Sequence, residues 1–299
     1  MALNLSKSFH IFVCLRNMKA FMKYTFSGHE TFQCKSLWLK KGYDYALSNK
    51  SFNDAEAVVA LGVGKNMVAS IKFWLRAFDI IDEEGNITWF GHYILGDNGK
   101  DQFLEDTNTL WLLHFHLVSN YYATIYRQLF INFHKERKDF SKVNLFNFIK
   151  RQFADHSFGS TIFNENTINK DIATFLKMYV TPDNCTFDDY AALLLNLNLV
   201  SHVERELYEF NYTTKADIDP LIFLYAIKTV AGNDKVVEYE KLLELSLVFC
   251  MSQNELYEIF NKINQLFPTI SFDNSAGEQL FTIRENITAR DILDKYYNK

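Results

Sequence analysis

The stretch Asn66–Ile80, which reads NMVASIKFWLRAFDI, decides the fold of this chain. Its apolar residues recur at the spacing of one helical face, namely Met67, Val68, Ile71, Trp74, Leu75 and Phe78. A second face of the same segment carries the cations Lys65, Lys72 and Arg76 and a single carboxylate. The stretch therefore predicts an amphipathic helix with a buried apolar face and an exposed basic face.

The neighbouring segments predict a small helical domain around this helix. Ser27 and Glu30 have the S-x-x-E spacing of a capping box, which predicts a helix from about Glu30 to Leu47. A short helix is expected over 53–61, a glycine turn over 62–64, and a hairpin around the polar turn 82–86. Helix, helix, turn, basic helix and hairpin is the order of a winged helix-turn-helix domain, which we place at residues 23–100. The alternative is a plain helical hairpin with a solvated cationic face.

A winged helix-turn-helix domain would bind double-stranded DNA through its second helix. Lys65, Lys72 and Arg76 are then expected to contact phosphates, and Asn66 or Ser70 to reach base edges.

The remainder of the chain is expected to be mainly α-helical. Only 3 Pro and 11 Gly occur in 299 residues, which favours long helices with few tight turns. We expect a helical body over 101–160 and a helical C-terminal domain over 161–299, with residues 161–231 entirely helical. That domain should end in a second winged-helix-like unit. We expect one helix over 239–247, a second helix that begins at a capping box of Ser252 and Glu255, and a hairpin over 269–283. Its second helix carries few cations, so we expect it to pack or to bind a partner.

Residues 1–22 are expected to be an upstream extension, with Met18 and Met22 as alternative starts. A signal peptide has positive charges before its apolar run, whereas here the positive charges follow the apolar run over 9–15. No apolar stretch is long enough to span a membrane. Cys14, Cys34, Cys185 and Cys250 form no zinc-type spacing, so free thiols in the cytoplasm are expected.

Charge is unevenly distributed along the chain, whose net charge is −5. Residues 1–80 hold 11 Lys and Arg against 5 Asp and Glu, whereas residues 161–299 hold 12 against 21. The net charge excludes a uniformly basic nucleic-acid binder, but the asymmetry favours a local polyanion-binding face on an acidic body. Chance clustering of surface charges is the alternative.

The sequence contains no standard catalytic motif. Residues 62–66 resemble a phosphate-binding loop but lack its first glycine and its Ser or Thr, so no nucleotide or organic cofactor is expected. The candidate catalytic residues are His29, Glu30, Asp106 and His114, because a histidine can transfer protons near neutral pH. Asp101, Glu105 and Asp106 form an acidic cluster that could hold Mg²⁺ or Mn²⁺. The alternative is that these side chains cap helices or lie in the core.

Several motifs resemble domain-of-unknown-function family 4007. They are FSGHETF over 26–32, LWLKKG over 37–42, LGVGKNMV over 61–68, FWL over 73–75, LED over 104–106, TLWLLH over 109–114 and SAG over 275–277. The resemblance begins near Lys23 and continues to the end of the chain. Lys35 and Phe115 depart from the pattern, where Arg and Trp would be expected.

The resemblance implies a cytoplasmic DNA-binding protein of a bacterial antiphage defence system. The family includes the nickase subunit of Ssp-type DNA phosphorothioation systems, which act with a cysteine desulfurase, an ATPase and a sulfur-transfer subunit. The expected function is therefore metal-dependent DNA nicking, although the resemblance assigns no catalytic residue. The alternatives are a non-catalytic DNA-binding subunit that recruits the modification enzymes or regulates transcription, and a winged helix that binds only protein.

Overall fold

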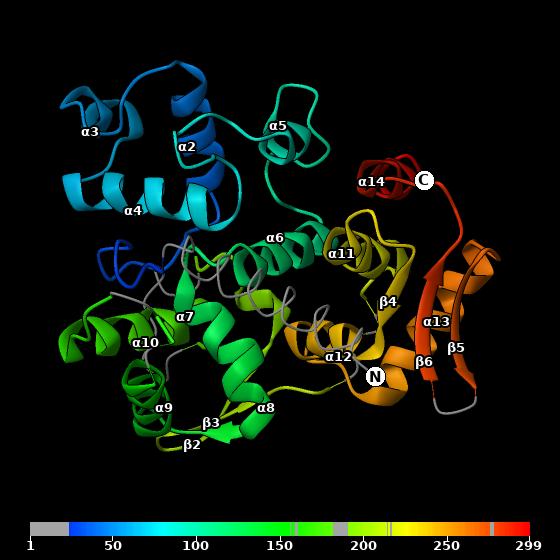
Figure 1. Ribbon diagram of the computed structural model, residues 1–299. Helices are drawn as coiled ribbons and strands as arrows, with labels where there is room; N and C mark the ends of the chain where they lie inside the picture. The colour runs from blue at the N-terminus through cyan, green and yellow to red at the C-terminus, as the bar shows by residue number, and fades with distance from the viewer. Residues whose placement is uncertain are drawn as a thin grey trace, which may run out of the picture.

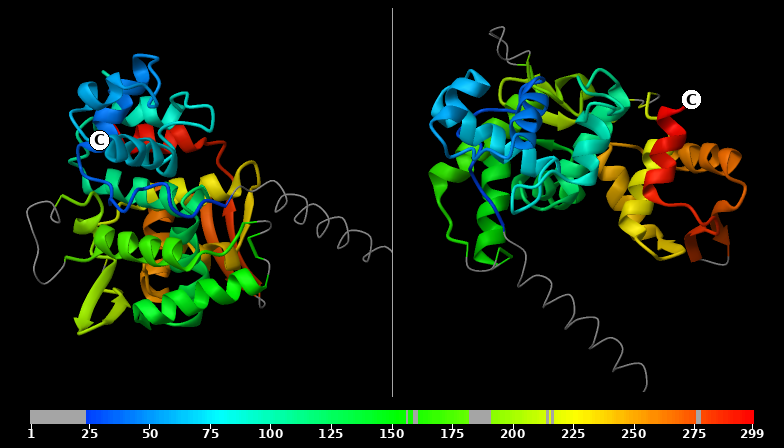
Figure 2. Two further views of the ribbon diagram at one scale, coloured as in Figure 1. Left: turned by 90° about the vertical axis from the view of Figure 1, so that its left-hand side faces the viewer. Right: turned by 90° about the horizontal axis from the view of Figure 1, so that it is seen from above.

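The computed structural model describes residues 24–155, 157–158, 161–181, 191–213, 215, 217–275 and 278–299. The described chain is mainly helical and contains two three-stranded antiparallel sheets (Figure 1). An N-terminal helical unit and a C-terminal unit both pack on a helical body, and the last helix of the chain reaches the N-terminal unit (Figure 1 and Figure 2). Within the described residues, no helix combines the length and apolar character needed to cross a membrane. The expected extension over 1–22 lies outside the described residues.

The N-terminal unit is built around the amphipathic helix that its sequence predicts. It contains α2 (Trp38–Leu47), α3 (Glu56–Leu61), α4 (Lys65–Ala77) and α5 (Trp89–Leu95). α4 buries Ile71 and Leu75 against Gly42 of α2, where an added Cβ would lie 2.7 Å from Ile71. Gly62 ends α3 with φ +64°, a backbone conformation that glycine adopts without steric cost. The apolar face of α4 therefore holds α2, α3 and α4 together.

Two expectations for this unit are wrong. The helix predicted from Glu30 begins only at Trp38, and Ser27 and Glu30 have φ values of +70° and +48° instead of forming a capping box. The expected hairpin after the polar turn is reduced to a single bridge between Ile81 and Ile87. The chain then turns into α5, because Thr88 caps that helix by accepting a hydrogen bond from the Gly91 amide.

The central body packs helices around α6 (Thr107–Ser119), which is buried on nearly all sides. The remaining helices are α7 (Thr124–Arg127), a π-helical turn (Gln128–Phe133), α8 (His134–Glu136), α9 (Lys142–Ala154), α10 (Glu165–Tyr179) and a 3₁₀ turn (Leu195–Leu197). Strands β1 (Asp139–Phe140), β2 (Val200–Glu204) and β3 (Leu207–Phe210) form a sheet in the order β1-β3-β2. The expectation that 161–231 is entirely helical is therefore wrong, because β2 and β3 form a hairpin within it.

The C-terminal unit confirms the helices and the hairpin predicted for it. It contains α11 (Pro220–Ala231), β4 (Val236–Glu238), α12 (Tyr239–Val248), α13 (Gln253–Leu266), β5 (Ile270–Ser275), β6 (Glu278–Ile283) and α14 (Ala289–Tyr297). Its sheet has the order β4-β6-β5, and Ser252 and Glu255 form the expected capping box at α13. α14 packs on α11 and reaches the N-terminal unit, where the Tyr93 hydroxyl donates to Asp294 over 2.9 Å.

Candidate nucleic-acid interface

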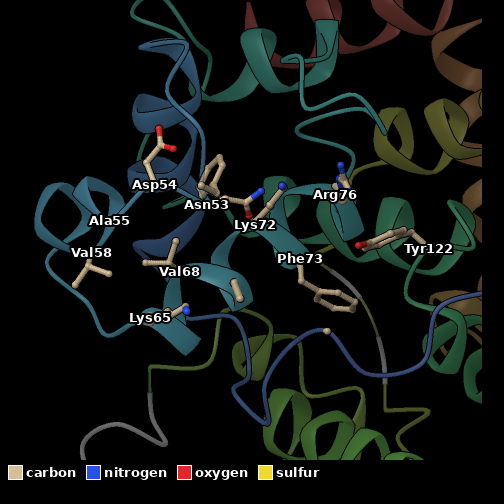
Figure 3. Close-up of a pocket in the computed structure, with 13 residues that line it drawn as sticks. Asn53, Asp54, Ala55, Val58, Lys65, Val68, Lys72, Phe73, Arg76 and Tyr122 are labelled. Carbon is tan, nitrogen blue, oxygen red and sulfur yellow. The ribbon is translucent and has the colours of Figure 1, made fainter.

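A groove of about 780 Å³ lies along the basic face of α4 (Figure 3). Lys65, Lys72 and Arg76 of α4 contribute to its lining. Asn53 and Asp54 border one side of the helix, Tyr122 borders the other, and Phe73 of α4 also lines the groove. The groove therefore gathers the predicted phosphate-binding cations on one concave surface.

None of the three cations forms a salt bridge with another described residue. Among the described residues, neither Lys65 nor Lys72 forms a salt bridge, and Asp54 is the only carboxylate that lines the groove. Arg76 is partly engaged, because its Nη2 donates to the backbone carbonyl of Glu83 over 2.5 Å. Its guanidinium also lies 6.0 Å from the ring centre of Tyr122. The groove consequently carries positive charge that an anion could neutralise.

The two predicted base-contacting residues differ in their exposure. Asn66 is exposed in the first turn of α4, where its side chain is accessible to a ligand. Ser70 is completely buried, and its hydroxyl has no hydrogen-bond partner among the described residues. Ser70 is therefore inaccessible to a base edge in this structure, and its base contact stays a prediction.

His29 is an internal side chain and not part of an open catalytic site. Only 3% of its surface is exposed, and its Nε2 lies 2.9 Å from Oδ1 of Asp171, which is 2% exposed. Its Nδ1 accepts a hydrogen bond from the Thr31 amide over 3.1 Å. Asp171 also accepts two hydrogen bonds from the Ser27 amide. These bonds fix the loop before α2 onto α10.

The two predicted catalytic carboxylates lie in different environments. Glu30 is exposed and belongs to the loop before α2 that His29 fixes. Asp106 is the N-cap of α6, as the structural alternative predicts, because its Oδ1 accepts from the Asn108 amide over 2.8 Å. Its Oδ2 accepts from the Tyr296 hydroxyl over 2.7 Å.

His114 lies in the core of the body, with both ring nitrogens in hydrogen bonds. Nδ1 pairs with the Tyr179 hydroxyl over 2.9 Å, and Nε2 donates to the Val248 carbonyl over 2.8 Å. Complete burial lowers the pKa of His114 to about 4 because the charged ring would lose its hydration. His114 is therefore inaccessible to a substrate in this structure, and its catalytic role stays a prediction.

The candidate acidic residues do not gather into a metal-binding cluster among the described residues. No group of three or more His, Cys, Asp or Glu side chains within the described ranges is placed to hold a metal ion. Asp101, the central member of the predicted acidic cluster, already accepts hydrogen bonds from the amides of Glu105 and Asp106. We derive no chemical step through a metal ion from these residues.

Three residues that the sequence did not single out help to build this region. Asp171 pairs with His29 across 142 positions, a separation that no local pattern reveals. Phe52 and Tyr122 line the groove beside the cations. The sequence signal that could have identified Phe52 and Tyr122 is that aromatic residues are interspersed among the cations of this region.

The chain belongs to the family described as Protein of unknown function (DUF4007), whose family model matches residues 26–297. This match confirms the resemblance inferred from the sequence motifs. No curated protein sequence gives a significant match to the chain.

Two solved structures of SspB have a similar fold. The magnesium ion-bound SspB crystal structure superposes with a TM-score of 0.81, and a second SspB crystal structure with a TM-score of 0.79. Each is 24% identical to this chain, and each match covers 92% of this chain and 88% of the SspB chain. At this level of identity the similarity establishes the shared fold.

Proposed function

We propose that this protein is the DNA-binding component of a bacterial phosphorothioate modification and antiphage defence system. The proposal combines family membership and the SspB-like fold with the groove on α4. The single observation that carries it is the set of cations Lys65, Lys72 and Arg76 along one groove, of which Lys65 and Lys72 have no carboxylate partner among the described residues. Phosphate contacts of this kind supply sequence-independent affinity for DNA.

In this proposal α2, α3 and α4 have the order of a helix-turn-helix, the basic face of α4 contacts phosphates, and the turn from Ile81 to Ile87 takes the place of a short wing. The order α11, β4, α12, α13, β5 and β6, with sheet order β4-β6-β5, supports a second winged-helix unit. The exposed face of α13 carries Glu258 and only one cation, Lys262, so this unit is suited to binding protein. Its partners would be the cysteine desulfurase, the ATPase and the sulfur-transfer subunit, in the cytoplasm.

The salt dependence of DNA binding tests the proposal. The slope of log affinity against log salt should become about 2–3 units shallower when Lys65, Lys72 and Arg76 are all replaced by Ala, because about three phosphate contacts are lost. The matched control replaces the exposed Lys170, Lys177 and Lys262 by Ala, which removes the same charge elsewhere. If the salt dependence of binding became equally shallow in both variants, or changed in neither, a specific role for the groove would be contradicted.

Metal-dependent nicking is a second candidate function. The observation that favours it is the similarity to an SspB structure described as magnesium ion-bound. The test incubates the full chain with supercoiled plasmid and Mg²⁺, Mn²⁺ or EDTA. Open circles that require the metal ion would establish nicking. A gel shift without open circles would favour a non-catalytic recruiting subunit or an enzyme that needs its partner to cut.

A further inference from the structure

The basic face of α4 lies in a concave groove instead of projecting from the surface. Asn53, Asp54 and Val58 border it on one side and Tyr122 on the other (Figure 3), and Gly28 also belongs to the lining. A major groove is about 12 Å wide, and a helix with its side chains is about 10–12 Å across. A helix flanked on both sides at this level is therefore poorly shaped to enter a major groove. The concavity instead fits a narrower anionic ligand.

The size and extent of the groove match a strand of nucleic acid. Its volume of about 780 Å³ is in the range of sites that enclose a small organic ligand. A second hollow of about 550 Å³ shares Phe52 and Lys72 with it and adds Lys50 to the lining. The two hollows are thus adjacent, so a chain of nucleotides could continue from one into the other.

An aromatic ring faces α4 beside the cations. Tyr122 is half-buried, its ring centre lies 5.3 Å from that of Phe73, and the Arg76 guanidinium is 6.0 Å away. Asn120 fixes this segment, because its Nδ2 donates to the carbonyls of Arg76 and Ala77 while its Oδ1 accepts from the Tyr122 amide. The ring therefore occupies a defined position at the end of α4.

We propose that this groove binds an unpaired deoxynucleotide within a DNA duplex. Lys72 and Arg76 are four residues apart on α4, about 6 Å along the helix axis, and hold the phosphates that flank the nucleotide. Its base leaves the stack and lies against Tyr122, since every nucleobase has a face that can stack on an aromatic ring. This inference rests on the proposed function and specifies the DNA structure that the same site recognises.

The test compares two duplexes that differ only by one extra unpaired 2-aminopurine nucleotide. The full chain should bind the bulged duplex about 10-fold or more tightly than the fully paired duplex, and the bound 2-aminopurine should change its fluorescence. Tyr122→Leu should abolish this preference, whereas Tyr122→Phe, which keeps the ring, should retain it. The readout is the ratio of the two affinities, bulged duplex over paired duplex, measured for each variant.

The failures of the two proposals are distinguishable. Equal affinity for both duplexes, with no fluorescence change, would overturn the unpaired-nucleotide inference and leave the proposed DNA-binding function in place. A preference that survives Tyr122→Leu would also overturn the assignment of the base to this groove. Failure to bind either duplex would overturn the proposed function, and the inference with it.

Discussion

The Nε2 atom of His29 lies 2.9 Å from Oδ1 of Asp171, and both side chains are almost completely buried. Because the Thr31 amide donates to Nδ1, the proton of the neutral ring is on Nε2, which donates to the carboxylate. This contact joins the loop before α2 to α10, and the same loop places Gly28 in the wall of the groove. His29 therefore influences the groove indirectly, by holding in place the loop that carries Gly28.

Replacing His29 by Ala should destabilise the fold by about 2–4 kcal/mol, because the buried Asp171 carboxylate loses its side-chain partner. The matched control is Glu30→Ala, which removes an exposed side chain and should change stability by less than about 0.5 kcal/mol. Urea unfolding of both variants provides the measurement. An unchanged midpoint for His29→Ala would contradict the structural role.

Gly28→Ala should destabilise the protein more than Gly62→Ala. Both glycines have positive φ values, +100° and +64°, so both substitutions cost about 1 kcal/mol in backbone strain. At Gly28 the added Cβ would also lie 2.7 Å from Cδ2 of Phe73, whereas at Gly62 nothing lies within 4 Å. Thermal unfolding of the two variants measures the difference, to which the Phe73 contact and the larger φ of Gly28 both contribute, and equal losses would contradict the close contact with Phe73.

The periodic helices could be predicted from the sequence because their signal is local. α4 shows its apolar and cationic faces within thirteen residues, and the Ser252–Glu255 cap marks the start of α13. The hairpin β2–β3 was missed because its short strands do not alternate cleanly between buried and exposed positions.

The loop before α2 could not be predicted by the same reasoning. Ser27 and Glu30 have the spacing of a capping box, but the Ser27 amide donates to Asp171, a residue of α10. A tertiary contact thus overrides the local helix signal. The candidate site was partly predictable for a related reason: Lys65, Lys72 and Arg76 lie on one helix, whereas Tyr122 comes from a distant segment.

Ser70→Ala should leave DNA affinity unchanged and should not destabilise the protein. The Ser70 hydroxyl is buried without a hydrogen-bond partner among the described residues, so its removal relieves an unsatisfied polar group. We expect a stability change between zero and a gain of about 1 kcal/mol. The control is Asn66→Ala, an exposed change on the same helix, which should lower DNA affinity without altering stability. If folded Ser70→Ala lost affinity for DNA, the prediction that Ser70 stays buried in the DNA complex would be contradicted.

Stability should decrease as the pH falls from about 6.5 toward 4, because His114 stays neutral in the folded protein. Its folded pKa is about 4 and its ordinary value is 6.5, so within this window the unfolded chain binds a proton that the folded chain does not. The free energy of unfolding therefore rises with pH across the window, by up to about 3 kcal/mol for this residue. His134, whose pKa burial also lowers to about 4, adds to the same dependence. Urea unfolding across this range should show a shallower pH dependence for His114→Gln than for the wild type. Equal pH dependence in the two proteins would show that His114 becomes charged without unfolding.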